Sequence, residues 1–227
     1  MKKFLGRIKA KLPQSWVGFA EYNLRPAQLD GYGILNGQVF RQVIFIDLLK
    51  ACKFEAIVET GTFVGCTTHF FAKNTDVPVY TVESNARVFQ LARRRLKPFP
   101  RVHLTRADSV EFLHTLPLAP RTPTFFYLDA HWEARLPLAE EVEFIASRFP
   151  RFVIMIDDFA VPGDAGYGFD DYGPGKQLSL RDFPFHQDSR MCVYFPAGTP
   201  VRNRDHAADA FFWPVRKCAR SSTRSIA

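Results

Sequence analysis

The hydrophobic positions between residues 53 and 160 form short apolar runs that alternate with stretches of helical periodicity. Short unbroken apolar runs are typical of strands that are buried on both faces of a parallel sheet. Strands that alternate with helices require crossover connections, so the pattern predicts an α/β fold with a doubly wound, mostly parallel sheet. The expected strands are residues 55–59, 77–83, 101–105, 124–129 and 153–156, and the expected long helices are at about residues 65–74, 84–96 and 134–148.

The segments around this alternation predict the domain organisation. Residues 1–52 are expected to form an N-terminal helical extension, with a helix at 38–50 over the mouth of the fold. The main domain is expected at residues 53–215, and a glycine-rich and acidic insertion at 159–188 interrupts it. Two further strand-like runs, which bring the predicted sheet to seven strands, are residues 191–196 and 210–215.

The basic residues of the chain are concentrated at its two ends. The formal net charge is +7, but residues 1–14 carry five basic residues and no acid, and the expected flexible tail at 216–227 carries four and no acid. The body between them is slightly acidic, which argues against a nucleic-acid-binding surface. The N-terminal segment has apolar residues at helical spacing, so it either packs on the domain, which we favour, or lies on an anionic membrane surface.

The hydrophobic runs and the cysteines predict a cytoplasmic protein. No run approaches the roughly 18 apolar residues of a membrane span, and the first residues do not read as a secretory signal. The four cysteines show no metal-binding spacing and are expected to be buried thiols in a reducing compartment.

Acidic residues stand at the end of nearly every predicted strand. In an open α/β sheet, ligands bind beyond the carboxyl ends of the strands. The acids are therefore expected to line one binding cleft. They are Glu59, Glu83, Asp108, Asp129, Asp157 and Asp158.

The loop after the first strand, ETGTFVGCTT at residues 59–68, places two glycines before a helix. It lacks the third glycine of dinucleotide-binding loops, and Glu59 would repel a pyrophosphate, so an NAD-dependent oxidoreductase is disfavoured. Glu59 would instead attract a sulfonium cation that carries an ammonium group. Glu83 is placed to accept the hydroxyl groups of a ribose, and Asp108 with Ser109 is placed near an adenine amino group.

The segments VETGTFVGCTT, YTVES, ADS, FFYLDAHW and VIMIDDF follow one another in an order that resembles the class I S-adenosylmethionine-dependent methyltransferases. The resemblance extends over about residues 53–196 and implies a Rossmann-like fold with S-adenosylmethionine as the cofactor. It also implies cofactor contacts by Glu59, Gly61, Thr62, Phe63, Gly65, Thr67, Glu83, Ser84, Asp108, Ser109 and Asp129.

Three carboxylates are expected to meet at the ends of the fourth and fifth strands, namely those of Asp129, Asp157 and Asp158. Carboxylates so close together repel, so some must be protonated, paired with arginine or lysine, or bound to a divalent metal. A cluster of oxygen ligands favours Mg²⁺ or a similar hard cation. Adjacent strand residues point to opposite faces, so Asp157 and Asp158 can share an ion only if the strand ends near Ile156 or Asp157.

The same carboxylates are similar to a pattern in the macrocin-type sugar O-methyltransferases. That resemblance implies Asp129, Asp157 and Asp158 as ligands of Mg²⁺ and a sugar-like hydroxylated molecule as the acceptor. It implies His131 as the general base beside Asp129, although a histidine stands here where the family usually has an acid. The alternative role for His131 is a hydrogen bond to loop backbone.

The sequence therefore predicts an S-adenosylmethionine-dependent O-methyltransferase that uses a divalent metal and a small-molecule acceptor. The insertion is expected to cover the acceptor, since its tyrosines and acids suit a sugar or polyol, and a solvated loop is the alternative. The rival prediction is a non-catalytic cofactor-binding or scaffold protein that docks through its basic tails to a membrane or an acidic partner. The oligomeric state stays open, with a homodimer among the options.

Overall fold

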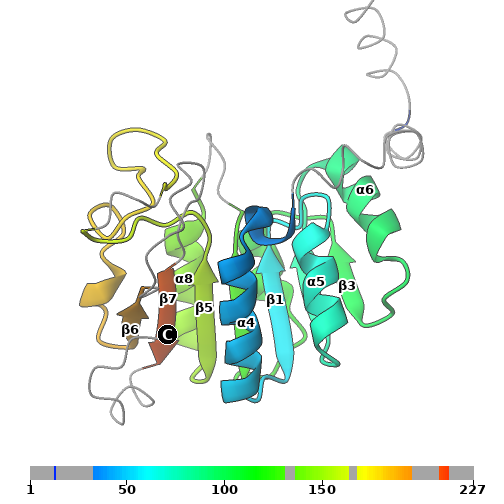
Figure 1. The fold of residues 1–227 in the computed structure, drawn as a ribbon, viewed down its shortest axis with the longest axis horizontal. Helices are drawn as coiled ribbons and strands as arrows, with labels where there is room; N and C mark the ends of the chain where they lie inside the picture. Colours follow the sequence, from blue (N-terminus) through cyan, green and yellow to red (C-terminus); the bar gives the residue numbers. More distant parts are fainter. Residues whose placement is uncertain (1–12, 14–32, 131–135, 164–167, 196–209, 215–227) are drawn as a thin grey trace, which may run out of the picture.

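The computed structural model describes residues 13, 33–130, 136–163, 168–195 and 210–214 (Figure 1). This part of the chain forms a seven-stranded sheet with strand order β3-β2-β1-β4-β5-β7-β6. Strands β1 to β5 run parallel, whereas β7 pairs antiparallel with β5 and β6 pairs antiparallel with β7. The strands are β1 Ala56–Thr60, β2 Val79–Val82, β3 Val102–Thr105, β4 Thr124–Leu128, β5 Phe152–Ile156, β6 Met191–Tyr194 and β7 Ala210–Pro214.

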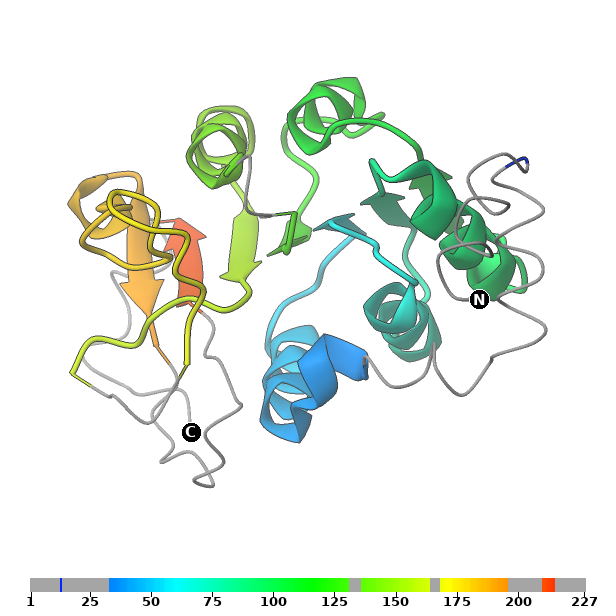
Figure 2. The ribbon, with the colours of Figure 1, turned by 90° about the horizontal axis from the view of Figure 1, so that it is seen from above.

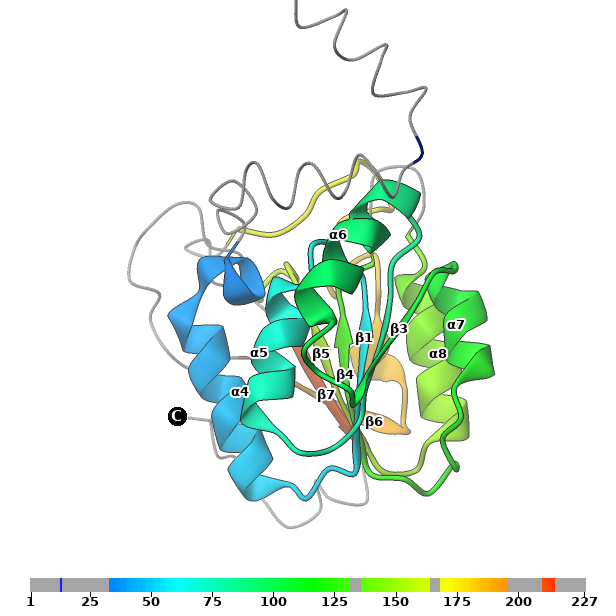
Figure 3. The same cartoon turned by 90° about the vertical axis from the view of Figure 1, so that its right-hand side faces the viewer.

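Helices cover both faces of the parallel part of the sheet. Seen from above and from the side, α4 and α5 lie on one face, and α7 and α8 lie on the other (Figure 2 and Figure 3). This arrangement confirms the predicted doubly wound α/β architecture. The helices are η1 Ile34–Gly37, α4 Val39–Ala51, α5 Cys66–Asn74, α6 Ala86–Leu96, α7 Ser109–Thr115, α8 Leu138–Arg148 and η2 Phe185–Gln187.

Two hydrophobic layers follow from the alternation of side chains along the strands. Val58 and Phe126 pack in the cluster that contains residues of α7 and α8. Their neighbours in sequence, Ile57 and Phe125, pack in the cluster that contains residues of α4 and α5. Because both faces are covered, every residue of β1, β4 and β5 is buried, which explains why these strands read as nearly unbroken apolar runs.

Helix α4 lies within the predicted N-terminal extension and packs directly on the sheet. Its Phe45 is fully buried, with its ring centroid 4.5 Å from that of Phe71 in α5 and 5.2 Å from that of Phe125 in β4. Residues 1–12 and 14–32 lie outside the described residues, so the remainder of the extension stays a prediction.

The insertion after β5 returns to the core. Leu178 is fully buried, its N–H donates to the carbonyl of Asp170 at 2.9 Å, and its carbonyl accepts from the N–H of Ala160 at 2.7 Å. Asp171 forms an antiparallel bridge with Gln177. These contacts hold the described second half of the insertion against the end of β5.

The structure bears on the predictions about membrane spans and cysteines. Within the described residues, no helix is both long enough and apolar enough to span a membrane. Cys52 and Cys66 are buried thiols that form no disulfide, but Cys192 is disulfide-bonded, so the expectation of thiols is wrong for Cys192. Its pairing could not be foreseen because cysteine spacing does not reveal connectivity. The basic tail at 216–227 lies outside the described residues.

Candidate functional site

The carboxyl ends of the parallel strands open into one cavity of about 670 Å³. Thr60 of β1 pairs with Leu128 of β4, and Leu128 pairs with Ile156 of β5, so these strands end side by side. The residues that follow them therefore meet at one edge of the sheet, as the sequence predicts. The lining includes Asn36, Gly61, Phe63, Glu83, Ser84, Asp108, Ser109, Asp129, Asp158, Asp170 and Tyr172.

A close backbone approach requires glycine at position 61. The φ angle of Gly61 is +86°, and a Cβ atom there would lie 2.1 Å from the backbone oxygen of Asp129. The N–H of Gly61 donates to the carbonyl of Val82 at 3.2 Å, and the N–H of Asp129 donates to the carbonyl of Thr60 at 2.9 Å. The loops after β1, β2 and β4 are thus held together at a point where only glycine fits.

Backbone donors fix the carboxylate of Glu83 just after β2. The N–H of Phe63 donates to Glu83 Oε2 at 2.9 Å, and the N–H of Asn85 donates to Oε1 at 2.7 Å. Burial raises the pKa of Glu83, and these hydrogen bonds act in the opposite direction. A carboxylate oxygen has two lone pairs, so Glu83 keeps acceptor capacity toward a ligand hydroxyl in the cavity.

Glu59 lies behind the first loop and does not contribute to the lining of the cavity. Its side chain is fully buried, accepts from the hydroxyl of Thr68, and accepts from Thr81 Oγ1 at 2.6 Å. Burial raises the pKa of Glu59 from its ordinary value of 4.5 to about 7. Glu59 therefore joins β1, β2 and α5 beneath the loop, whereas the sequence predicts that its charge faces the cofactor.

Asp108 and Ser109 lie at the start of α7. The Oδ1 atom of Asp108 accepts from the N–H groups of Val110 at 3.0 Å and Glu111 at 3.4 Å, so Asp108 is the N-cap of the helix. Both Asp108 and Ser109 also line the cavity, where the predicted adenine contact would lie.

Thr62, Gly65 and Thr67 shape the first loop but are not part of the cavity lining. The hydroxyl of Thr62 shares a hydrogen bond with that of a β2 threonine at 2.5 Å. Gly65, with φ of +79°, caps α5, and a Cβ atom there would lie 3.3 Å from Leu96. Thr67 Oγ1 accepts from the N–H of Leu35 at 3.1 Å, which ties η1 to α5.

The aspartates after β5 share one counterion. The strand ends at Ile156 and Asp158 has a φ of +51°, which confirms the prediction that extended structure stops before these side chains. Arg41 Nη1 donates to Asp157 Oδ1, and Arg41 Nη2 donates to Asp158 Oδ1 at 3.0 Å. Asn36 Nδ2 donates to Asp157 Oδ2 at 2.7 Å and to Asp158 Oδ2 at 3.5 Å.

Arg41 and Asn36 are site residues that the sequence motifs do not predict. Arg41 stands at helical spacing from Phe45 and Leu48 and is buried with them, and an arginine on such an apolar stripe is unusual. That irregularity is a signal that could have identified Arg41. Asn36 gives no such signal, because its role depends on the left-handed backbone of Leu35 and Asn36, whose φ angles are +49° and +54°.

The predicted Mg²⁺ ligands do not fit a metal site in this arrangement. All the carboxylate oxygens of Asp157 and Asp158 accept hydrogen bonds from Arg41 or Asn36. Among the described residues, no group of three or more His, Cys, Asp or Glu side chains is placed to hold a metal ion. Pairing with arginine, which the sequence left open as an alternative, is the arrangement that the structure shows.

Asp129 is the acid of the predicted trio that lies beside this ion pair. Burial raises the pKa of Asp129 well above its ordinary value, and Asp158 adds to this effect while Arg41 opposes it. Asp170 and Tyr172 line the same cavity, and the hydroxyl of Tyr172 donates to Asp170 Oδ2. A carboxyl with a raised pKa in a cavity is a candidate for proton transfer.

His131, the predicted general base, lies outside the described residues.

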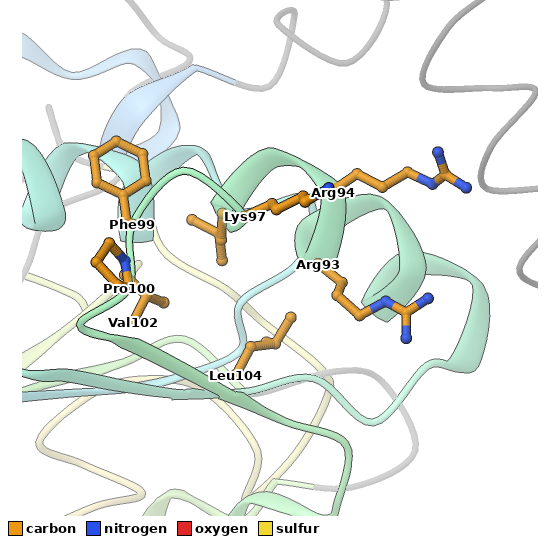
Figure 4. A pocket seen from close by; sticks show the side chains of 8 residues that line it. Arg93, Arg94, Lys97, Phe99, Pro100, Val102 and Leu104 are labelled. Atoms are coloured by element: carbon orange, nitrogen blue, oxygen red, sulfur yellow. The ribbon is translucent and has the colours of Figure 1, made fainter.

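A second hollow, of about 650 Å³, lies beside α6 and β3 and carries none of the predicted site residues (Figure 4). It is lined by Arg93, Arg94, Leu96, Lys97, Phe99, Pro100, Val102 and Leu104. The described lining of this hollow contains no carboxylate, whereas the cavity at the strand ends is lined by several acidic residues.

Comparison with known proteins identifies the fold. No protein-family model matches the sequence, and no curated protein matches it. Cofactor-bound Rv0187 from MTB is similar with a TM-score of 0.63 and 17% identity, over 92% of this chain and 94% of that chain. An O-methyltransferase from Bacillus cereus in complex with SAH gives a TM-score of 0.60 and 15% identity, over 91% of this chain and 94% of that chain.

A third similar structure is that of the O-methyltransferase TomG from Streptomyces achromogenes, involved in tomaymycin synthesis, in complex with SAM. Its TM-score is 0.60 at 14% identity, over 92% of this chain and 94% of that chain. At such identities the likeness shows the fold. The chain has the Rossmann-like fold of the class I S-adenosylmethionine-dependent methyltransferases.

Proposed function

We propose that the protein is an S-adenosylmethionine-dependent O-methyltransferase that acts on a hydroxyl group of a small sugar-like or polyol acceptor. The observation that carries the proposal is a continuous cavity at the strand ends, which extends from Glu83 to Asp129 and Asp158. A cofactor and an acceptor in one cavity can be held in line, and such positioning supplies much of the rate of a transfer reaction.

The part of the cavity near β1 and β2 suits the cofactor. Glu83 presents a fixed carboxylate to the ribose hydroxyls, and Asp108 and Ser109 lie beyond it toward the adenine. The lining contains several acids and, among the described residues, no lysine or arginine. Such a lining attracts the sulfonium and ammonium charges of S-adenosylmethionine.

The part of the cavity near β4 and β5 suits a hydroxylated acceptor. Asp129, Asp158 and Asp170 offer oxygen atoms that accept hydrogen bonds from hydroxyl groups. Asp129 would take the proton of the acceptor hydroxyl while the oxygen bonds to the methyl carbon and the carbon–sulfur bond of the cofactor breaks. His131 remains the second candidate for this proton, on the resemblance alone.

Metal dependence, which the macrocin-type resemblance implies, does not enter this proposal. A divalent ion would need the oxygens of Asp157 and Asp158 that Arg41 and Asn36 engage. The proposed methyl transfer therefore uses no metal.

Calorimetric titration with S-adenosylmethionine and S-adenosylhomocysteine tests the cofactor site. Wild-type protein is expected to bind both, and Glu83→Ala is expected to lower the affinity roughly 10- to 100-fold, since charge-assisted hydrogen bonds contribute about 1.5–3 kcal/mol. Glu111→Ala, which removes an exposed carboxylate on α7 outside the cavity, is the matched control. A wild-type protein that binds neither ligand would contradict the proposed function.

Methyl transfer itself is measured with methyl-labelled cofactor and a panel of acceptors that includes sugars, polyols, amines and carbon acids. Label transferred to a hydroxyl oxygen supports the proposal. Label found exclusively on nitrogen or carbon acceptors would contradict the assignment as an O-methyltransferase.

A further inference from the structure

We infer that the guanidinium of Arg41 takes the place of the divalent cation that the sequence resemblance implies, so that Arg41 is a positioning residue and the acceptor site is assembled without a metal. The inference rests on the proposed function only for the experiments that measure turnover, and the metal-binding experiments do not depend on it. The placement of Arg41 between the aspartates stands on the contacts alone.

One fork-shaped side chain bridges both aspartates. Arg41 uses Nη1 toward Asp157 and Nη2 toward Asp158, so each carboxylate receives a charged donor. Asn36 supplies a further donor to each carboxylate, at 2.7 Å and 3.5 Å. Planar arginine side chains orient carboxylates through such paired hydrogen bonds. Arg41 and Asn36 together bring adjacent like charges to one point, which a metal would otherwise do by coordination.

The charges and the burial leave no room for a metal beside Arg41. The side chains of Arg41 and Asp157 are 3% and 0% exposed, and that of Asp158 is 19% exposed. Because water is largely excluded around Arg41 and Asp157, a divalent cation next to the guanidinium would be repelled strongly. Mg²⁺ also requires oxygen ligands at about 2.0–2.1 Å, and N–H donors already engage these oxygens. Metal binding would therefore require Arg41 to leave.

The core holds Arg41 in position. Phe45 and Leu48, which follow Arg41 on the same face of α4, are buried against the sheet. The segment before α4 is anchored by the fully buried Leu35, whose N–H donates to Thr67 Oγ1 at 3.1 Å. Arg41 therefore reaches the aspartates from a helix that the core holds in place.

The arrangement also has a consequence for the acceptor. Asp158 lines the cavity beside Asp129, whereas Asp157 is fully buried behind it. The acceptor thus meets carboxylate oxygens that accept hydrogen bonds from its hydroxyl groups, and no ion that must be coordinated by two adjacent oxygens. An acceptor with one free hydroxyl group in reach of Asp129 is expected to be competent.

The experiment measures metal binding directly. Wild-type protein is titrated with Mn²⁺, followed by calorimetry and by the electron paramagnetic resonance of the free ion, and no stoichiometric binding is expected. Arg41→Met, which replaces the cation by an apolar chain of similar length, is expected to bind one Mn²⁺. With the ion in about 100-fold excess over its dissociation constant, the Tm of the variant is expected to rise by about 5–10 °C.

The controls separate this site from general effects. Arg101→Met removes a half-buried arginine that lies 3.6 Å from Asp76, and it is expected to create no Mn²⁺ site. Arg41→Met combined with Asp157→Asn is expected to lose the Mn²⁺ binding that Arg41→Met gains. Arg41→Lys, which keeps the positive charge, is expected to fold without Mn²⁺ and to bind none.

Two results would overturn the inference. One is stoichiometric Mn²⁺ binding by the wild-type protein, which decides the question even where Arg41→Met is too unstable to purify. The other is an Arg41→Met protein that neither binds Mn²⁺ nor is stabilised by it. Turnover that is unchanged by EDTA supports the inference, and turnover that EDTA abolishes and Mg²⁺ restores contradicts it. Failure to bind S-adenosylhomocysteine would refute the proposed function and leave the metal-binding result standing.

Discussion

The substitution Glu59→Gln tests the buried environment beneath the first loop. Glutamine keeps the shape of the side chain and removes its titration. Because burial raises the pKa of Glu59 from 4.5 to about 7, the folded protein holds this proton more tightly than the unfolded chain. The contribution of Glu59 to stability is therefore fully present below the unfolded pKa and is lost as the pH rises through the folded pKa.

The size of the effect follows from the shift. One pKa unit corresponds to about 1.36 kcal/mol, so a rise from 4.5 to about 7 corresponds to about 3 kcal/mol. Glu59 is fully buried, so solvent screening does not diminish the effect. The free energy of unfolding of the wild type, relative to that of Glu59→Gln, is expected to fall by about 3 kcal/mol between about pH 4 and pH 8.

Urea unfolding of both proteins, followed by circular dichroism over this pH range, measures the difference. Glu143→Gln is the control, because Glu143 is exposed and its hydrogen bonds to Arg190 lower its pKa. Its contribution is present above the unfolded pKa and is lost as the pH falls, which is the opposite sign. A difference between wild type and Glu59→Gln that stays constant within about 1 kcal/mol would refute the reasoning about Glu59.

Substitutions in the cavity give further tests. Gly61→Ala is expected to abolish S-adenosylhomocysteine binding and to lower the free energy of unfolding by more than about 1 kcal/mol, because the added Cβ would lie 2.1 Å from the backbone oxygen of Asp129. Calorimetry and urea titrations measure the two effects. The control is Gly163→Ala, whose Cβ would meet no atom of the described residues within 4 Å. Asp129→Asn is expected to reduce turnover by roughly 10²- to 10⁴-fold while cofactor binding persists. The turnover of the wild-type protein is expected to rise with pH, because Asp129, whose pKa is raised, loses its proton and becomes a base. If the Asp129→Asn variant turned over as fast as the wild-type protein, Asp129 would be excluded as the base.

The sheet and the edge that carries the site could be predicted because their signals are local. The run at residues 153–156 becomes β5 at Phe152–Ile156, since a strand that is buried on both faces must be apolar throughout. The acids after the strands then fall at one edge, because parallel strands end together. The turn at Asp158 follows from the same reasoning, since two carboxylates on opposite faces of a strand cannot share a partner.

The partners of these acids could not be predicted, because they come from distant parts of the chain. Asn36 and Asp157 are 121 positions apart, and Arg41 and Asp157 are 116 positions apart, and no periodicity links them. Glu59 shows a different limit. The place of Glu59 in the loop motif suggests a ligand contact. In the structure the Glu59 side chain instead accepts hydrogen bonds from Thr68 and Thr81. The spacing of residues in the motif does not reveal the direction of this side chain.

The ion pair also bears on where the functional domain begins. The sequence assigns residues 1–52 to an extension, yet Arg41 of α4 neutralises the fully buried Asp157. A chain that starts at residue 53 would leave this carboxylate without its guanidinium, which costs about 3–5 kcal/mol, and would uncover the ring of Phe125 that Phe45 contacts. Since a typical domain is stable by about 5–15 kcal/mol, we expect the shortened chain to show no cooperative urea unfolding. A shortened chain that unfolds cooperatively and binds S-adenosylhomocysteine would show that α4 is dispensable and that Arg41 does not organise the site.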